Sequence, residues 1–158
     1  MAEQTAAADE VTGLVRALHH LLNTTASAST MDAGMVASGF PLVGDQPAFL
    51  LLHHLAHGGP TTPSHAADML RTGRSNLSKI AMRLETAGLL VRTRDPQDER
   101  QIRLELTPQG QQIGDRLVAL SVDHMGRALQ QWPARDVTDL RRLLLALGSA
   151  MTEVKPRS

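Results

Sequence analysis

At three points in this 158-residue chain, a capping residue followed closely by proline predicts where a helix begins. The capping residues are Asp45, Thr62 and Thr107, each with a proline one or two positions later. Their side-chain oxygens accept hydrogen bonds from the free amides of a first helical turn. Proline fits that turn because its missing N–H would have no partner there. The pattern therefore predicts helices that begin near these three residues.

A glycine turn separates two short helices in the middle of the chain. The first is predicted over residues 62–70, the turn is Arg71-Thr72-Gly73, and the second helix covers 74–87. An earlier helix over 45–57 ends where Gly58-Gly59 interrupts it. Two short helices joined by a glycine turn are typical of a helix-turn-helix motif.

A β-hairpin is predicted directly after this motif. Gly88 ends the preceding helix, and a first strand follows over residues 89–93. Apolar and polar residues then alternate over 102–106, which predicts a second, half-buried strand. The loop over 94–100 is polar and too long for a tight turn. The central unit is therefore expected to consist of three helices and a hairpin.

Apolar residues at three- and four-residue spacing predict amphipathic helices at both ends of the chain. The predicted helices cover residues 9–26, 107–132 and 136–151, and Asp136 is expected to cap the last one. The stretch 23–44 is rich in Ala, Ser, Thr and Gly, and its later part is expected to be a connection. The small central unit cannot bury all three apolar stripes, so we expect a second copy of the chain to cover them. A monomer that folds these helices onto itself is the alternative.

The distribution of charge and the scarcity of aromatic residues narrow the choice of partner. The chain has 16 basic and 16 acidic residues, but six basic residues and one acid lie between Arg71 and Arg94. Two phenylalanines, one tryptophan and no tyrosine argue against binding single strands by base stacking. If the basic stretch binds nucleic acid, that partner is expected to be double-stranded.

Several functions are excluded by what the sequence lacks. Without cysteine there can be no disulfide, no thiolate metal ligand, no cysteine nucleophile and no regulation by cysteine oxidation. The sequence has no run of 18 apolar residues and no basic leader with an apolar centre, so we expect a cytoplasmic protein. No glycine-rich phosphate-binding motif occurs either, and we expect no cofactor.

One face of the helix over 74–87 is a candidate DNA-reading surface. With Leu77 as reference, Ile80, Ala81 and Leu84 fall within one apolar stripe, which is expected to be buried. Short polar side chains near the start of the opposite face can reach base edges, and the cations further along can neutralise phosphates. An ordinary solvated helix face is the alternative interpretation. The opposite face presents Ser75, Lys79, Met82 and Thr86, with Asn76 and Arg83 on one flank and Ser78 on the other.

The loop over 94–100 offers a second candidate contact. Arg100 is placed to enter the minor groove, where narrow A·T tracts attract guanidinium groups. Asp98 is expected to orient that arginine by a charge-assisted pair. A solvated hairpin with a weak surface ion pair is the alternative.

Three segments resemble the MarR family of winged-helix transcription regulators: Arg83-Leu84-Glu85-Thr86-Ala87-Gly88-Leu89-Leu90-Val91-Arg92, Asp95-Pro96-Gln97-Asp98-Glu99-Arg100 and Leu104-Glu105-Leu106-Thr107-Pro108-Gln109-Gly110. The resemblance covers the end of the recognition helix, the wing and the start of the long helix after it. It implies a homodimer that binds a pseudopalindromic operator in double-stranded DNA, with an effector crevice between the dimer helices and the winged lobe. It also implies that Asp98 and Arg100 are the wing-tip acid and the minor-groove arginine, and that the helix contacting bases and phosphates carries Ser75, Asn76, Ser78, Lys79 and Arg83. We expect Arg74 and Arg94 to bind DNA as well.

With this resemblance, the predicted fold class is mainly α with a small β-hairpin wing. A winged helix-turn-helix lobe over 45–106 is expected between an N-terminal dimerisation helix and connection over 1–44 and C-terminal dimerisation helices over 107–158. The expected function is that of a DNA-binding transcription regulator, and specifically of a repressor released by a small-molecule effector. We expect no enzyme activity.

The histidines leave alternatives open. His53 and His57 lie four residues apart, a spacing that can chelate zinc. The segment between them lacks the glutamate that would act as general base in a metallopeptidase, so a metal-dependent hydrolase is the weaker alternative. A histidine-based metal-sensing site in the same fold is another, and a winged-helix module that binds protein is a third. No metal ligand is predicted.

Overall fold

The computed structural model describes residues 2–25 and 28–154, and this part of the chain contains seven helices and one two-stranded antiparallel sheet. The chain divides into two compact units, one up to residue 120 and one from residue 121. The predicted fold class, mainly helical with a small hairpin, is confirmed. The elements are α1 (Ala2–Thr25), α2 (Ala28–Ser38), α3 (Gln46–Gly58), α4 (Pro63–Met69), α5 (Arg74–Thr86), β1 (Leu90–Arg94), β2 (Ile102–Leu106), α6 (Pro108–Ala128) and α7 (Ala134–Glu153).

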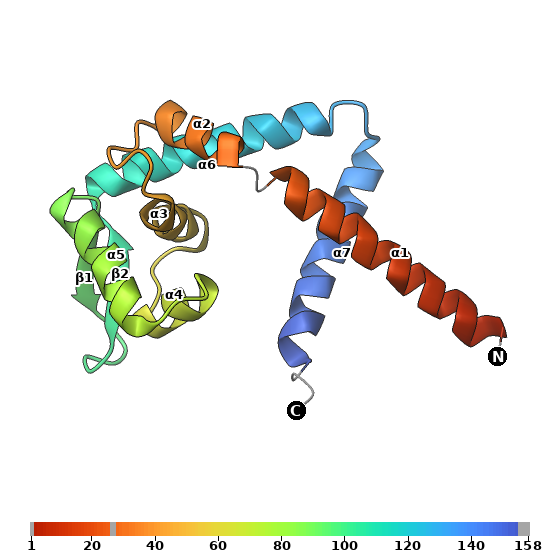
Figure 1. The fold of residues 1–158 in the computed structure, drawn as a ribbon, viewed down its shortest axis with the longest axis horizontal. Helices are drawn as coiled ribbons and strands as arrows, with labels where there is room; N and C mark the ends of the chain where they lie inside the picture. The colour runs from red at the N-terminus through yellow and green to blue at the C-terminus, as the bar shows by residue number, and fades with distance from the viewer. Residues whose placement is uncertain (1, 26–27, 155–158) are drawn as a thin grey trace. The chain divides into compact units, whose positions relative to one another are not determined.

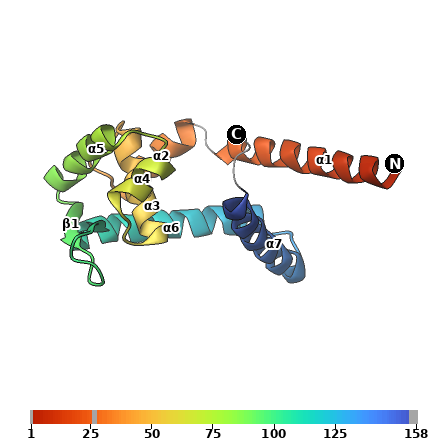
Figure 2. The same cartoon turned by 90° about the horizontal axis from the view of Figure 1, so that it is seen from below.

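Helices α3, α4 and α5 and the hairpin pack together as a winged lobe (Figure 1). Strands β1 and β2 pair from Leu90 opposite Leu106 to Arg94 opposite Ile102. Thr61, just before α4, adds a single bridge on the other side of β2, where it exchanges two backbone hydrogen bonds with Leu104. The loop between the strands projects away from the helices of the lobe (Figures 1 and 2).

The hydrophobic core lies inside this lobe and draws on elements outside residues 45–106. Met35 of α2 and Phe40 after it are almost fully buried, and so are Ile113 and Leu117 of α6. The Phe40 ring contacts the Phe49 ring edge-on, with centroids 5.3 Å apart. The remaining core residues are Ala48, Leu51, Leu52, Leu55, Ala66, Ala67, Leu77, Ile80, Ala81, Leu84, Leu89, Leu90 and Leu104.

All three predicted cap-plus-proline starts are confirmed. Asp45 accepts a hydrogen bond from the Ala48 amide at 3.2 Å, and Thr62 accepts one from the His65 amide at 3.3 Å. Thr107 accepts from the backbone amide at position 110 at 3.1 Å. The starts of α3, α4 and α6 therefore follow directly from the local sequence.

The predicted cap at Asp136 is wrong. Helix α7 begins at Ala134, and Pro133 occupies its N-cap without any side-chain hydrogen bond. Pro133 provides the extended backbone before the helix, and its carbonyl already accepts from the Asp136 amide at 2.9 Å. Asp136 therefore lies within the first turn, where a carboxylate still interacts favourably with the helix dipole.

Helix α2 was not predicted, because its Ala, Ser, Thr and Gly residues form no one-sided apolar pattern. The helix is stabilised from outside: Met35 is buried, and the Arg116 guanidinium donates to the Ser38 carbonyl at 2.6 Å. A left-handed Gly39 ends it, and the Phe40 amide bonds back to the Met35 carbonyl, as in a Schellman motif. Only the segment after Gly39 is a connection.

The terminal helices expose much of their apolar surface. Helix α1 begins earlier than predicted, and Val11, Leu14 and Val15 on it are between 49% and 61% exposed. Helix α7 has no buried residue, and Leu144 and Met151 of its predicted apolar stripe are exposed. Within the described residues, none of the helices has the length and apolarity needed to cross a membrane.

Candidate nucleic-acid interface

Helix α5 buries the predicted face and exposes the opposite one. Leu77, Ile80 and Leu84 are at most 2% exposed and face the core of the lobe. The predicted reading face is exposed along its whole length, and Met82 on it is 60% exposed. The exposed residues are Ser75, Asn76, Ser78, Lys79, Met82, Arg83 and Thr86.

The turn before α5 positions the start of this face. Arg71 adopts a left-handed backbone conformation with φ of 49°, which lets the chain reverse within the turn. Thr72 accepts a hydrogen bond from the Asn76 side-chain amide at 2.8 Å. Asn76 was predicted to read a base, and its amide nitrogen is held by the turn while its side chain stays exposed.

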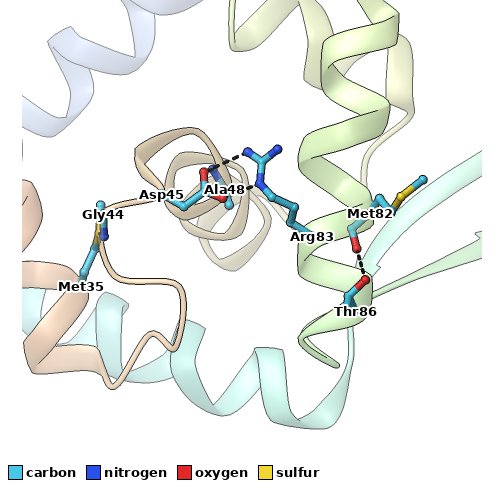
Figure 3. A network of polar contacts seen from close by, with 7 residues as sticks. All are labelled: Met35, Gly44, Asp45, Ala48, Met82, Arg83 and Thr86. Carbon is cyan, nitrogen blue, oxygen red and sulfur yellow. Dashed lines mark hydrogen bonds and ion pairs between the residues drawn. The ribbon is translucent and has the colours of Figure 1, made fainter.

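Arg83 was predicted to contact DNA, but its guanidinium is bound within the lobe (Figure 3). Nη2 donates to Asp45 Oδ1 at 2.9 Å, and Nε donates to Asp45 Oδ2. The hydrogen bonds from Arg83 hold the pKa of the Asp45 carboxyl below its usual range, so the carboxylate is charged at neutral pH. Sequence analysis missed this partner because 38 residues separate the two side chains.

A second basic residue of the region is also paired. Arg92 on β1 forms an ion pair with Glu85 at 3.1 Å. By contrast, Arg74 and Lys79 on α5 make no side-chain ion pair with any residue that the structure describes. The available positive charge on α5 therefore lies at its first two turns.

Hydrogen bonds and an ion pair, within the loop and to the two strands, hold the polar loop between β1 and β2 in shape. Asp95 accepts from the Gln97 amide at 2.8 Å and forms an ion pair with Arg103 at 3.6 Å. Arg94 donates to the Glu99 carbonyl at 3.3 Å across the base of the loop. Arg94, predicted as a DNA contact, thus also holds the wing together.

The predicted ion pair between Asp98 and Arg100 is not formed. Asp98 instead accepts from the backbone amide of Arg100 at 3.1 Å and from the Gln101 side-chain amide at 3.1 Å. Both carboxylate oxygens are therefore used to shape the loop tip. Arg100 is exposed, and its guanidinium pairs with no acid in the described chain.

Four of the seven histidines form two neighbouring pairs. The rings of His53 and His57 lie 4.5 Å apart, and those of His54 and His65 lie 6.0 Å apart. Burial lowers the pKa of His53 from its usual value, and the neighbouring His57 lowers it further. Among the described residues, no group of three or more histidine, aspartate or glutamate side chains is arranged to hold a metal ion.

The helix-turn-helix, the bridge at Thr61 and the hairpin loop define a winged helix-turn-helix protein. The model of the MarR family matches residues 42–101. This match confirms the resemblance seen in the sequence. The match favours a transcription regulator, as the sequence predicted, over an enzyme.

Solved structures show the same fold. A MarR family protein from Bacillus stearothermophilus has a TM-score of 0.67 and 22% identity, over 97% of this chain and 99% of that chain. RV1404 from Mycobacterium tuberculosis has a TM-score of 0.61 and 23% identity, over 95% and 97%. NadR in complex with 4-hydroxyphenylacetate has a TM-score of 0.59 and 22% identity, over 86% and 89%. No curated protein matches the chain.

Proposed function

We propose that two copies of this chain form a transcription regulator that binds a pseudopalindromic site in double-stranded DNA. The observation that carries the proposal is the exposed, polar and cationic face of α5 in a lobe that matches the MarR family model. A recognition helix of this kind lies in the major groove, with its first turns at the base edges. The first turns of α5 carry the hydroxyl, amide and unpaired cationic groups that such contacts need.

Each part of the interface has a separate role in this proposal. Ser75, Asn76 and Ser78 read base edges, and Arg74 and Lys79 neutralise phosphates. The wing inserts Arg100 into the adjacent minor groove. Asp98 and Arg94 keep the wing in shape through the bonds described above, without binding bases themselves.

Dimerisation is proposed to involve the ends of the chain, within residues 1–44 and 107–158. Helix α1 exposes Val11, Leu14 and Val15, and α7 buries none of its residues within a single chain. Apolar surface of this extent on terminal helices is favourable only when another chain covers it. A two-fold pair would place two α5 helices about one turn of DNA apart, roughly 34 to 36 Å.

We further propose that the regulator is a cytoplasmic repressor whose DNA affinity falls when a small molecule binds. Support comes from the neighbour NadR, which has the same fold and was solved in complex with 4-hydroxyphenylacetate. A ligand that lowers operator affinity must bind the DNA-free form more tightly than the DNA-bound form. Screening small aromatic acids for release of the operator probe tests this part.

Selection of bound duplexes from a random pool tests the proposal as a whole. We expect an inverted repeat whose half-sites are about 10 to 10.5 base pairs apart from centre to centre. A dimer with about 6 to 10 phosphate contacts should also lose about 10³ to 10⁵ in affinity between 50 and 200 mM salt. Selection of a single, asymmetric motif would contradict the dimer, and no enrichment at low salt would contradict DNA binding.

A further inference from the structure

The bond between Asp45 and Arg83 connects the start of α3 with the third turn of α5 (Figure 3). Both carboxylate oxygens and two guanidinium nitrogens take part, so the contact is a bidentate fork. Such a fork fixes direction as well as distance, because both groups are planar. Among the side chains that the structure describes, this fork is the polar contact between the proposed recognition helix α5 and α3.

Asp45 is itself held in place from several sides. Its Oδ1 accepts from the Ala48 amide as the N-cap of α3, and its backbone amide donates to the Leu42 carbonyl at 2.9 Å. Just before it, the Gly44 amide donates to the sulfur of the buried Met35 at 3.4 Å. The Asp45 side chain is only 20% exposed. Arg83 is therefore bound to a fixed acceptor rather than to a mobile surface carboxylate.

Two further polar contacts tie α5 to its neighbours in the chain, the ion pair of Glu85 with Arg92 on β1 and the Asn76 bond to the turn, and its packing against α3 is otherwise apolar. Leu77, Ile80 and Leu84 pack in the core, and apolar packing tolerates small rotations of a helix about its own axis better than a bidentate bond does. Arg83 lies on the flank of α5 that faces Asp45, whereas Met82 points away from it (Figure 3). A bond on one flank restricts the rotation that determines which residues face the groove.

We propose that Arg83 is a positioning residue, which Asp45 holds so that α5 presents its reading face to the major groove, and that Arg83 makes no phosphate contact of its own. This inference rests on the proposed DNA-binding function. The rival role for Arg83, that of a phosphate contact, makes the opposite prediction for Asp45. If Arg83 contacted a phosphate, Asp45 would compete for its guanidinium and weaken DNA binding. Replacing Asp45 would then strengthen DNA binding.

Four single variants, one of them a control, and one double variant separate these roles. Arg83→Gln removes the fork, and Arg83→Lys keeps the charge without it. Asp45→Ser removes the carboxylate but keeps a hydroxyl that can cap α3. Lys79→Gln is the control for a phosphate contact on the same helix. Thermal unfolding of each variant identifies those that fold before any DNA titration.

The measurements are operator affinity, discrimination against single-base operator variants, and the dependence of affinity on salt. We expect Arg83→Gln, Arg83→Lys and Asp45→Ser each to lower operator affinity. Each should also reduce the preference for the operator over its single-base variants, which in the wild type should be about 5- to 150-fold at a position that the protein reads. The double variant Asp45→Ser/Arg83→Gln should bind the operator no more weakly than whichever of its two single variants binds more weakly, because both substitutions remove the same bond. The salt slope should stay unchanged in Arg83→Gln and fall by about two in Lys79→Gln, one for each chain of the dimer.

The opposite pattern overturns the inference. If Arg83→Gln lowers the salt slope as Lys79→Gln does, while Arg83→Lys binds like the wild type and Asp45→Ser binds more tightly, then Arg83 is a phosphate contact. Losses that simply add in the double variant would also contradict a shared positioning role. Failure of the proposed function itself gives a different result, because the wild-type protein would then show no salt-dependent duplex binding.

Discussion

The backbone of Gly110 lies so close to Leu89 that a Cβ atom at position 110 would be 2.0 Å from the Leu89 carbonyl oxygen. The same oxygen accepts a hydrogen bond from the Thr107 amide at 3.1 Å, and the Thr107 hydroxyl donates to the Gly88 carbonyl. The first turn of α6 is thus fixed against the backbone that leads into β1. The wing and the long helix after it are joined by a contact that only glycine permits.

Gly110→Ala should therefore destabilise the protein. The added methyl group overlaps backbone atoms that cannot move away without disturbing β1, and overpacking of this kind costs about 1 to 3 kcal/mol or more. Gly126→Ala in the same helix is the control, because nothing lies within 4 Å of its Cβ position. That change should leave stability unchanged or raise it by up to about 1 kcal/mol. Urea unfolding measures both, and equal effects of the two substitutions would contradict the close contact.

Asp45→Ala and Asp45→Ser should differ in stability. Alanine removes both the cap of α3 and the bond to Arg83, whereas serine retains a capping hydroxyl. We expect alanine to be the less stable of the two by about 0.5 to 2 kcal/mol, the usual contribution of a cap. The midpoint of urea unfolding gives the difference. If the two variants unfold at the same concentration, the capping bond to Ala48 contributes nothing.

His53 should make the folded state sensitive to mild acid. Burial, together with His57 and His54, lowers the pKa of His53 below its usual value of 6.5. The folded state then binds fewer protons than the unfolded state. The contribution of His53 to the free energy of unfolding is therefore complete above about pH 6.5. It is lost as the pH falls through the pKa that His53 has in the folded state. His53→Gln should flatten this part of the stability curve, and His124→Gln at an exposed site is the control. An unchanged curve in His53→Gln would contradict the assignment.

Arg100→Ala should weaken operator binding and leave the dimer intact. The wing tip loses its unpaired guanidinium, while Asp98 can still hold the loop through the backbone amide at position 100. Arg135→Ala removes the same charge from α7, outside the proposed DNA contacts, and should have little effect on affinity once sedimentation has shown that its dimer is intact. A gel-shift titration compares the two variants. If both bind the operator like the wild type, the minor-groove role of Arg100 is wrong.

Local signals predicted most of the fold. The caps at Asp45, Thr62 and Thr107 fixed three helix starts, and periodicity identified the buried face of α5 through Leu77 and Ile80. Helix α2 escaped prediction because tertiary contacts stabilise it, chiefly the burial of Met35 and the bond from Arg116. A single sequence without a one-sided apolar pattern does not reveal such contacts.

The candidate site was predictable in composition but not in its internal bonds. Sequence spacing placed Arg83 on the exposed flank of α5, yet it could not reveal an acceptor 38 residues away at Asp45. Asp98 was correctly assigned to the wing loop, but its acceptor oxygens are taken by the loop itself, through the Arg100 amide and Gln101. Short carboxylates in turns often accept hydrogen bonds from nearby backbone amides. The position of Asp98 in a turn is therefore the sequence signal that predicts bonds within the loop instead of a pair with the Arg100 guanidinium.

The stoichiometry of the complex with a selected duplex tests the central claim most directly. Sedimentation equilibrium at low salt should give a free protein of two 17.1 kDa chains, and the complex should contain one duplex and two chains. Raising the salt should dissociate the DNA before it separates the chains, because phosphate contacts depend on salt and apolar packing does not weaken with it. A single 17.1 kDa chain in solution that leaves the duplex unbound would contradict both the dimer and its function.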